Sequence, residues 1–110
     1  MRALLPAIII SCLIAGCDGS LRYRGSVSSS VVSLENCHVA LSDRGSKEVM
    51  DFEHFNPPEF SGSFLVQPTD REYLLTVTCK NHVPKHLVVR YQARGGAIEL
   101  GNVRLTPVSE

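Results

Sequence analysis

The sequence predicts an all-β domain, a small β-sandwich of about seven short strands. Between residues 21 and 110, apolar residues recur at every second position rather than at helical spacing. Clusters of Gly, Pro, Asn, Asp and Ser separate these runs at short intervals. The same stretch shows no credible long amphipathic helix. Short alternating strands with frequent turns are typical of two packed antiparallel sheets.

The first two expected strands lie close together in the sequence. Residues 23–27 alternate Tyr, Gly and Val with Arg and Ser, which indicates a strand with one apolar face. The three serines at 28–30 have no periodicity and predict a loop. Residues 37–41 alternate Cys, Val and Leu with His and Ala, and residues 43–45 supply turn chemistry.

Residues 47–56 fit two interpretations. As a strand, the segment turns three side chains toward the core: Met50, Phe52 and His54. As a helical turn, it aligns a different set: Val49, Phe52 and Phe55. We favour the strand. Asn56-Pro57-Pro58 ends either element, because proline lacks an amide donor and restricts the residue before it.

The C-terminal half carries the strongest strand signal. A short strand at 64–66 follows Ser and Gly residues, and residues 73–79 form a β-branched run. One face of that run is apolar: Tyr73, Leu75, Val77 and Cys79. Near the end, residues 98 and 100 have the opposite phase to residues 103 and 105. A one-residue bulge at Gly101 would return all four side chains to one buried face.

The N-terminus reads as an export signal. Arg2 precedes a short apolar stretch, residues 3–14, which is far below the ~20 residues of a permanent membrane span. Leu13-Ile14-Ala15-Gly16-Cys17 resembles the lipobox of bacterial lipoproteins. The resemblance implies cleavage before Cys17, palmitate-type acylation of that residue and stable membrane anchoring. It divides the chain into a signal peptide (1–16), a lipidated cysteine with a tether (17–20) and the sandwich (21–110). Asp18 favours the inner membrane, although the choice of membrane stays open.

Cysteine usage suits an oxidising compartment. Of the four cysteines, Cys12 leaves with the signal and Cys17 carries lipid. Cys37 and Cys79 remain, and both are in phase with the apolar faces of their strands. A structural disulfide is the simplest use of this pair, because a redox-active pair favours close Cys-x-x-Cys spacing.

The order of the strands resembles the carboxypeptidase regulatory-like domain, a small transthyretin-like (prealbumin-like) sandwich. The resemblance rests on five segments: Gly25-Ser26-Val27, Cys37 to Leu41, Gly62 to Val66, Tyr73 to Thr78 and Leu100 to Leu105. Asn81-His82 departs from the Gly-aromatic pair that the family often has there. The resemblance implies a non-catalytic module used for stability, adhesion or protein contact.

Candidate chemistry is sparse. His82 and His86 are four residues apart, the spacing of a helical zinc pair, but Pro84 separates them and strand-like residues flank them. We expect surface histidines and no metal or other cofactor, with these two as the weak metal candidates. Asp51 and Glu53 share one face of the expected strand, and we expect them to form a solvated edge rather than a pair of catalytic carboxylates. The net charge of zero disfavours a nucleic-acid partner.

The expected function is therefore a membrane-anchored periplasmic lipoprotein, a non-catalytic module in protein–protein contacts at the cell envelope. Narrower alternatives are an accessory lipoprotein of a secretion system and a toxin-immunity lipoprotein. An alternative of another class is a histidine-based metal-binding protein or hydrolase. The partner's identity and the oligomeric state stay open at this point.

Overall fold

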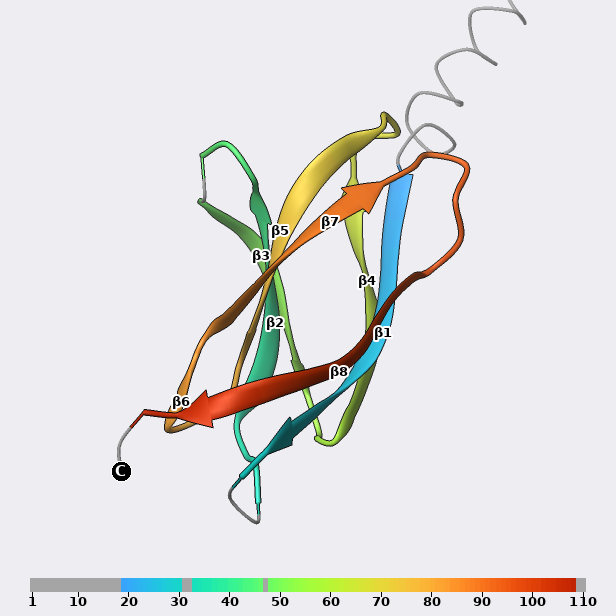
Figure 1. Cartoon of the computed structure of the whole chain (residues 1–110). Coiled ribbons are helices and arrows are strands. Elements are labelled where there is room, and N and C mark those ends of the chain that lie inside the picture. The colour runs from blue at the N-terminus through green and yellow to red at the C-terminus, as the bar shows by residue number, and fades with distance from the viewer. Residues whose placement is uncertain (1–18, 31–32, 47, 109–110) are drawn as a thin grey trace, which may run out of the picture.

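The computed structural model describes residues 19–30, 33–46 and 48–108, and these form eight strands and no helix. The strands are β1 (Gly19–Ser29), β2 (Cys37–Asp43), β3 (Val49–Phe55), β4 (Glu59–Val66), β5 (Arg71–Thr78), β6 (His82–Val83), β7 (Lys85–Tyr91) and β8 (Ile98–Pro107) (Figure 1). The predicted all-β sandwich is confirmed. In this described part, no helical segment has the length and apolarity that a membrane span requires. The predicted signal peptide, Cys17 and Asp18 lie outside the described residues.

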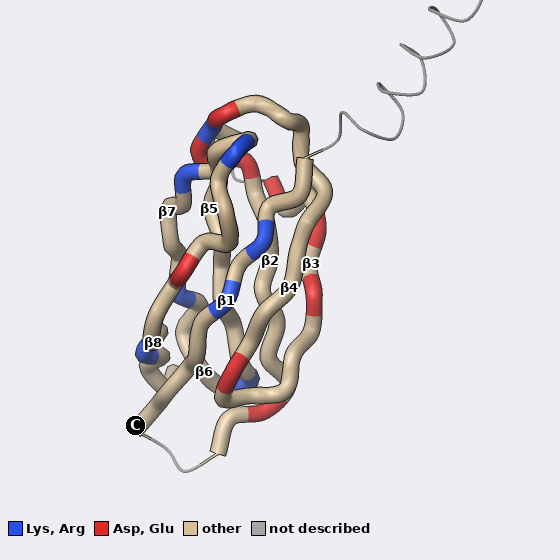
Figure 2. Tube along the Cα trace, turned by 90° about the vertical axis from the view of Figure 1, so that its right-hand side faces the viewer, with Lys and Arg blue, Asp and Glu red and all other residues tan. Residues whose placement is uncertain are grey.

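The strands form two four-stranded sheets. Sheet A has the order β4-β1-β8-β6, and sheet B has the order β3-β2-β5-β7. Neighbouring strands run antiparallel except β1 and β8, which are parallel. Figure 2 views the molecule from the side on which β1 and β4 of sheet A face the reader. The chain therefore passes between the two layers repeatedly, which gives each sheet one face on the shared core and one outer face.

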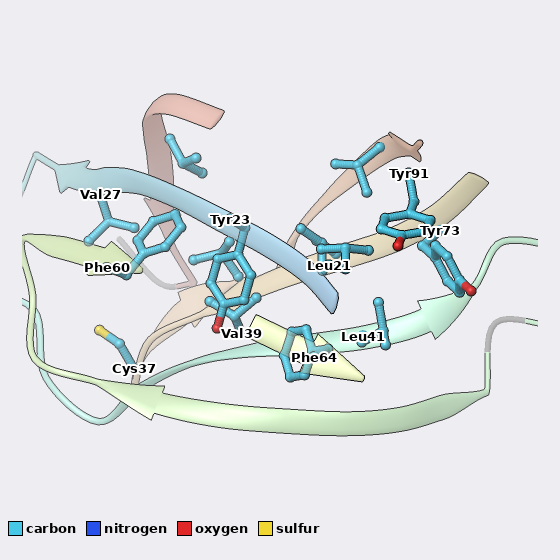
Figure 3. Close-up of a cluster of buried hydrophobic side chains, with 14 of the residues drawn as sticks. Leu21, Tyr23, Val27, Cys37, Val39, Leu41, Phe60, Phe64, Tyr73 and Tyr91 are labelled. Atoms are coloured by element: carbon cyan, nitrogen blue, oxygen red, sulfur yellow. The ribbon is translucent and has the colours of Figure 1, made fainter. Parts of the chain in front are cut away.

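The core lies between the sheets and contains the alternating residues that the pattern predicted. Leu21, Tyr23 and Val27 of β1 meet side chains from sheet B across the gap (Figure 3). The ring of Tyr23 stacks on that of Phe64, with the centroids 5.2 Å apart. On the opposite layer the whole predicted run is buried: Tyr73, Leu75, Val77 and Cys79.

The predicted disulfide is confirmed: Cys37 and Cys79 are bonded, and both are buried. Cys37 begins β2 and Cys79 directly follows β5, and these two strands are neighbours in sheet B. The disulfide therefore joins adjacent strands of one sheet and points into the core between the sheets. It closes a long segment of chain, since the two cysteines are 42 residues apart.

The preferred interpretation of residues 47–56 is half right. Val49–Phe55 is a strand, β3, but Phe52 and His54 face outward and Met50 is exposed, so the predicted core orientation is wrong. The phase of β3 is set by Phe55, whose ring lies 4.9 Å from that of Phe60 at the end of the core. β3 is the edge strand of sheet B, so fewer core contacts determine which of its two faces points inward.

The predicted bulge in the last strand is confirmed. Arg24 pairs with Glu99 and Gly25 with Gly101, which leaves Leu100 as the extra residue. Gly101 has a φ of 68°, a left-handed conformation that glycine adopts without strain. Ile98 before the bulge and Val103 after it consequently both pack against the core, as does Leu100.

Two predicted boundaries are wrong. Ser28 and Ser29 belong to β1 rather than to a loop, because they pair with Arg104 and Leu105 of β8. Gly19 and Ser20, assigned to the tether, also belong to β1 and pair with the end of β4. The sandwich therefore begins two residues after Cys17.

Candidate functional site

The outer face of sheet B is the candidate site, and the strand register defines it. Residues that pair across neighbouring strands point to the same side of a sheet. Three rows follow from the pairing: His54-His38-Thr78, Phe52-Ala40-Thr76-His86 and Val49-Ser42-Leu74-Val88. We call these residues the sheet B face. The three rows contain no Asp, Glu, Lys or Arg.

The sheet B face exposes apolar side chains. Phe52 is 53% exposed, Val88 54% and Val49 59%. The same face has a shallow hollow of about 460 Å³ with Val49, Leu74 and Pro84 in its lining. Its floor is closed, since Ala40 and Ser42 are buried although they point away from the core. The arrangement is a concave apolar surface with hydroxyl and imidazole groups around it.

Two histidines meet on this face. His38 of β2 and His54 of β3 are direct partners in the ladder, and their ring centroids lie 5.8 Å apart at an interplanar angle of 67°. The ring of Phe52 stands edge-on to both, 6.0 Å from His38 and 5.5 Å from His54. Burial lowers the pKa of His38 below its ordinary value of 6.5, and the neighbouring His54 lowers it further. His38 is therefore neutral at pH 7.

The structure separates the two weak metal candidates, His82 and His86. His82 lies in β6 at the edge of sheet A, whereas His86 lies in β7 on the sheet B face. His82 is buried; its Nδ1 donates to the carbonyl oxygen of Lys80 at 2.9 Å, and its Nε2 accepts from the Ser29 hydroxyl at 2.7 Å. Both of its nitrogens are occupied, which leaves none for a shared metal ion.

His86 has a different environment. It is exposed, and its Nδ1 lies 2.9 Å from the Thr76 hydroxyl oxygen in a hydrogen bond. Thr76 is its direct ladder partner, so this bond holds the ring along the sheet. Across the part of the chain that the structure describes, no group of three or more His, Cys, Asp or Glu residues is arranged to hold a metal ion.

Asp51 and Glu53 lie on the core-facing side of β3, opposite Leu41 and Val39. Glu53 accepts a hydrogen bond of 2.5 Å from the hydroxyl of Tyr23. Burial raises the pKa of Tyr23 well above its ordinary value of 10.0, and the bond to Glu53 raises it further. Inward-pointing charges also protect an edge strand from pairing with other chains, so both carboxylates have a structural role.

The outer face of sheet A has a contrasting composition. Basic residues lie along β1, and the acidic Glu59 lies on the neighbouring β4 (Figure 2). Arg24 forms an ion pair with Glu99 across β1 and β8. Asn102 accepts from the Ser28 hydroxyl at 2.8 Å and donates to the Ser26 hydroxyl at 3.2 Å. These polar groups are bonded to one another and are exposed, which is the arrangement of a solvated surface.

Sequence reasoning did not find the sheet B face. It identified the alternation of His38 with core residues but assigned Phe52 and His54 to the core. The missing information was the β2–β3 register, which brings residues 16 positions apart into contact. A scan against models of known protein families found no match for this chain, and a search of curated proteins found none either.

Proposed function

We propose that this chain is a lipid-anchored envelope protein whose sandwich is a non-catalytic binding module, and that it contacts a protein partner through the sheet B face. The observation that carries the proposal is the uncharged composition of the three rows. Interface cores are depleted in charged residues and enriched in aromatic ones, while their rims are polar. Phe52 lies in the middle row. Glu72 and Arg90, which are paired across β5 and β7, provide charged residues at one end of the sheet B face.

The composition favours a protein over a nucleic acid or a lipid surface. Both of those partners attract clusters of Lys and Arg, which the three rows lack. A protein partner with an apolar patch would cover Phe52, Val49 and Val88 and could hydrogen-bond to the hydroxyl and imidazole groups of the same rows. Narrower forms of the proposal are an accessory subunit of a secretion machine and an immunity protein that neutralises a toxin.

The anchor sets where the partner must be. If Cys17 carries acyl chains, only Asp18 separates the lipidated residue from β1, and the two residue steps from Cys17 to Gly19 span at most about 7 Å. The sandwich would then stay at the membrane surface on the periplasmic side. Asp18 supports the inner membrane as the location. The partner is accordingly a membrane-associated or envelope protein.

Fractionation of cells tests the anchor. The full chain should sediment with membranes, and Cys17→Ser should move it to the soluble fraction because the acylated residue is lost. A density gradient then separates inner from outer membrane, and Asp18 favours the inner one. Sedimentation of Cys17→Ser with membranes, at the wild-type level, would refute lipid anchoring.

Site-specific photo-crosslinking tests the face. A photoreactive amino acid replaces Val88 on the sheet B face or Ser63 on the outer face of sheet A, in the full acylated chain in its native envelope. A defined protein adduct should form from position 88 and not from position 63. Mass spectrometry of that adduct distinguishes a secretion component from a toxin. An adduct that forms only from position 63 contradicts the proposed face.

A further inference from the structure

The imidazole rings of His38 and His54 lie at a separation that two imidazoles bound to one metal ion can have. A metal-bound imidazole nitrogen lies about 2.0 Å from its ion, so two rings on one ion have centroids about 4.5–6 Å apart, depending on the angle between the bonds. The observed separation of 5.8 Å is within this range. Both side chains project from the solvent side of adjacent strands, so an ion can reach them without opening the core.

The nitrogens of these two rings are also available. Within residues 19–30, 33–46 and 48–108, the imidazole ring of neither His38 nor His54 forms a hydrogen bond. The other two histidines of the chain differ, because His82 uses both nitrogens and His86 is bonded to Thr76. Of the four histidines, the two whose rings form no hydrogen bond in the described part of the chain are the two that face each other.

We propose that His38 and His54 form a two-imidazole coordination site for a late first-row divalent cation. Cu²⁺ is the ion that we expect this site to bind most tightly. Imidazole suits copper, nickel and zinc, and Cu²⁺ has the highest affinity of these in the usual order. The two nitrogens fill part of the coordination sphere, and water or a group from another molecule fills the rest. A bound ion would also link the edge strand β3 to β2.

Two neighbouring features support the site. Phe52 stands edge-on to both rings and limits their rotation, which reduces the ordering that metal binding requires. His38 is in the neutral form that metals bind, since burial lowers its pKa. The site does not depend on the proposed protein contact, because both imidazoles belong to this chain and water can fill the remaining positions.

Copper binding to the full acylated chain in detergent tests the proposal. Isothermal titration with CuCl₂ should show one ion per chain, and electron paramagnetic resonance should show two imidazole nitrogens bound to it. Removing an outer partner of a metal ligand costs about 10–100-fold in affinity, so His38→Gln or His54→Gln should weaken binding by at least about tenfold. Copper should also raise the unfolding temperature of the wild type and not that of His54→Gln.

Matched variants make the outcome decisive. His86→Gln removes another exposed histidine of the same face, and Phe52→Thr removes an apolar contact but keeps both imidazoles; both should bind copper. Circular dichroism verifies that each variant is folded. The proposal is wrong if His54→Gln binds copper like the wild type, or if the spectrum of the wild type shows only oxygen ligands. Failure of the photo-crosslink at position 88 leaves the copper result unaffected, so the two proposals are tested separately.

Discussion

The outer faces of the two sheets differ in how their side chains are satisfied. On sheet A, Arg24 pairs with Glu99 and Asn102 bonds to neighbouring hydroxyls, so polar groups interact along the surface. On sheet B, Phe52 and Val88 are more than half exposed, and two imidazoles have no hydrogen bond within the described residues. The two layers share one core and one chain, yet sheet B exposes Phe52, Val49 and Val88 together, whereas on the outer face of sheet A the exposed Leu65 stands beside polar residues.

This difference supports the proposed contact face. Covering apolar area releases about 25 cal/mol for each Å² removed from water, whereas covering ion pairs and hydroxyl networks costs desolvation. Contiguous exposed apolar patches on soluble domains mark interaction sites for the same reason. The sheet B face gains from being covered, and the outer face of sheet A does not. Substitutions in each sheet can break or sharpen this comparison.

The largest effect is expected from the disulfide of sheet B. Replacing both Cys37 and Cys79 by Ala should lower the free energy of unfolding by about 4 kcal/mol, because the crosslink closes a long loop in the unfolded chain. Urea unfolding of the full chain in detergent measures the loss. Reduction of the wild type should reproduce it. A loss below about 1 kcal/mol would show that sheet B does not depend on its covalent link.

Sheet A depends instead on the close approach of β1 and β8. A Cβ at Gly25 would lie 2.8 Å from the carbonyl oxygen of Gly101 and 2.9 Å from the ring of Phe60. Gly25→Ala should therefore destabilise the protein by about 1–3 kcal/mol through overpacking. Gly96→Ala is the matched control, since nothing lies within 4 Å of its Cβ position. Equal stability of the two variants would mean that β1 and β8 can separate without cost.

Most of the fold was predictable, because burial imposes the period of two on central strands. The run from Tyr73 to Cys79 shows this, since its predicted face is wholly buried. The phase of β3 was not predictable, because this edge strand has apolar residues on both sides. Its phase depends on two contacts made by the same side of the strand, the packing of Phe55 on Phe60 and the hydrogen bond of Glu53 with Tyr23, which is 30 residues away in the sequence. The proximity of His38 and His54 likewise depends on register, which no local pattern contains.

A smaller effect on stability is expected from the hydrogen bond between the sheets, which joins Tyr23 of sheet A to Glu53 of sheet B. Tyr23→Phe keeps the ring against Phe64 and should cost about 1–2 kcal/mol for the lost hydrogen bond to a carboxylate. The raised pKa of Tyr23 adds a pH signature. Above pH 10 the unfolded chain loses the phenolic proton and the folded chain keeps it, so stability falls as pH rises.

The measurement is urea unfolding of the wild type and Tyr23→Phe between pH 9 and pH 10.5. Each tyrosine that keeps its proton in the folded chain lowers the free energy of unfolding by up to about 1.4 kcal/mol per pH unit above pH 10. The wild type should lose stability more steeply than the variant. Burial also raises the pKa of Tyr73, so the variant should retain part of the slope. Identical slopes would exclude Tyr23 as a group that links alkaline pH to the contact between the sheets.

The smallest effect on stability is expected on the sheet B face itself. Phe52→Thr keeps a strand-forming side chain at an exposed position and should change the free energy of unfolding by no more than about 0.5 kcal/mol. The same change should strongly reduce the photo-crosslink from position 88, because the aromatic side chain beside the hollow is lost. Ser61→Thr on the outer face of sheet A is the control and should leave the crosslink intact. A large loss of stability in Phe52→Thr, with the crosslink retained, would mean that this ring completes the fold of sheet B rather than its contact with a partner.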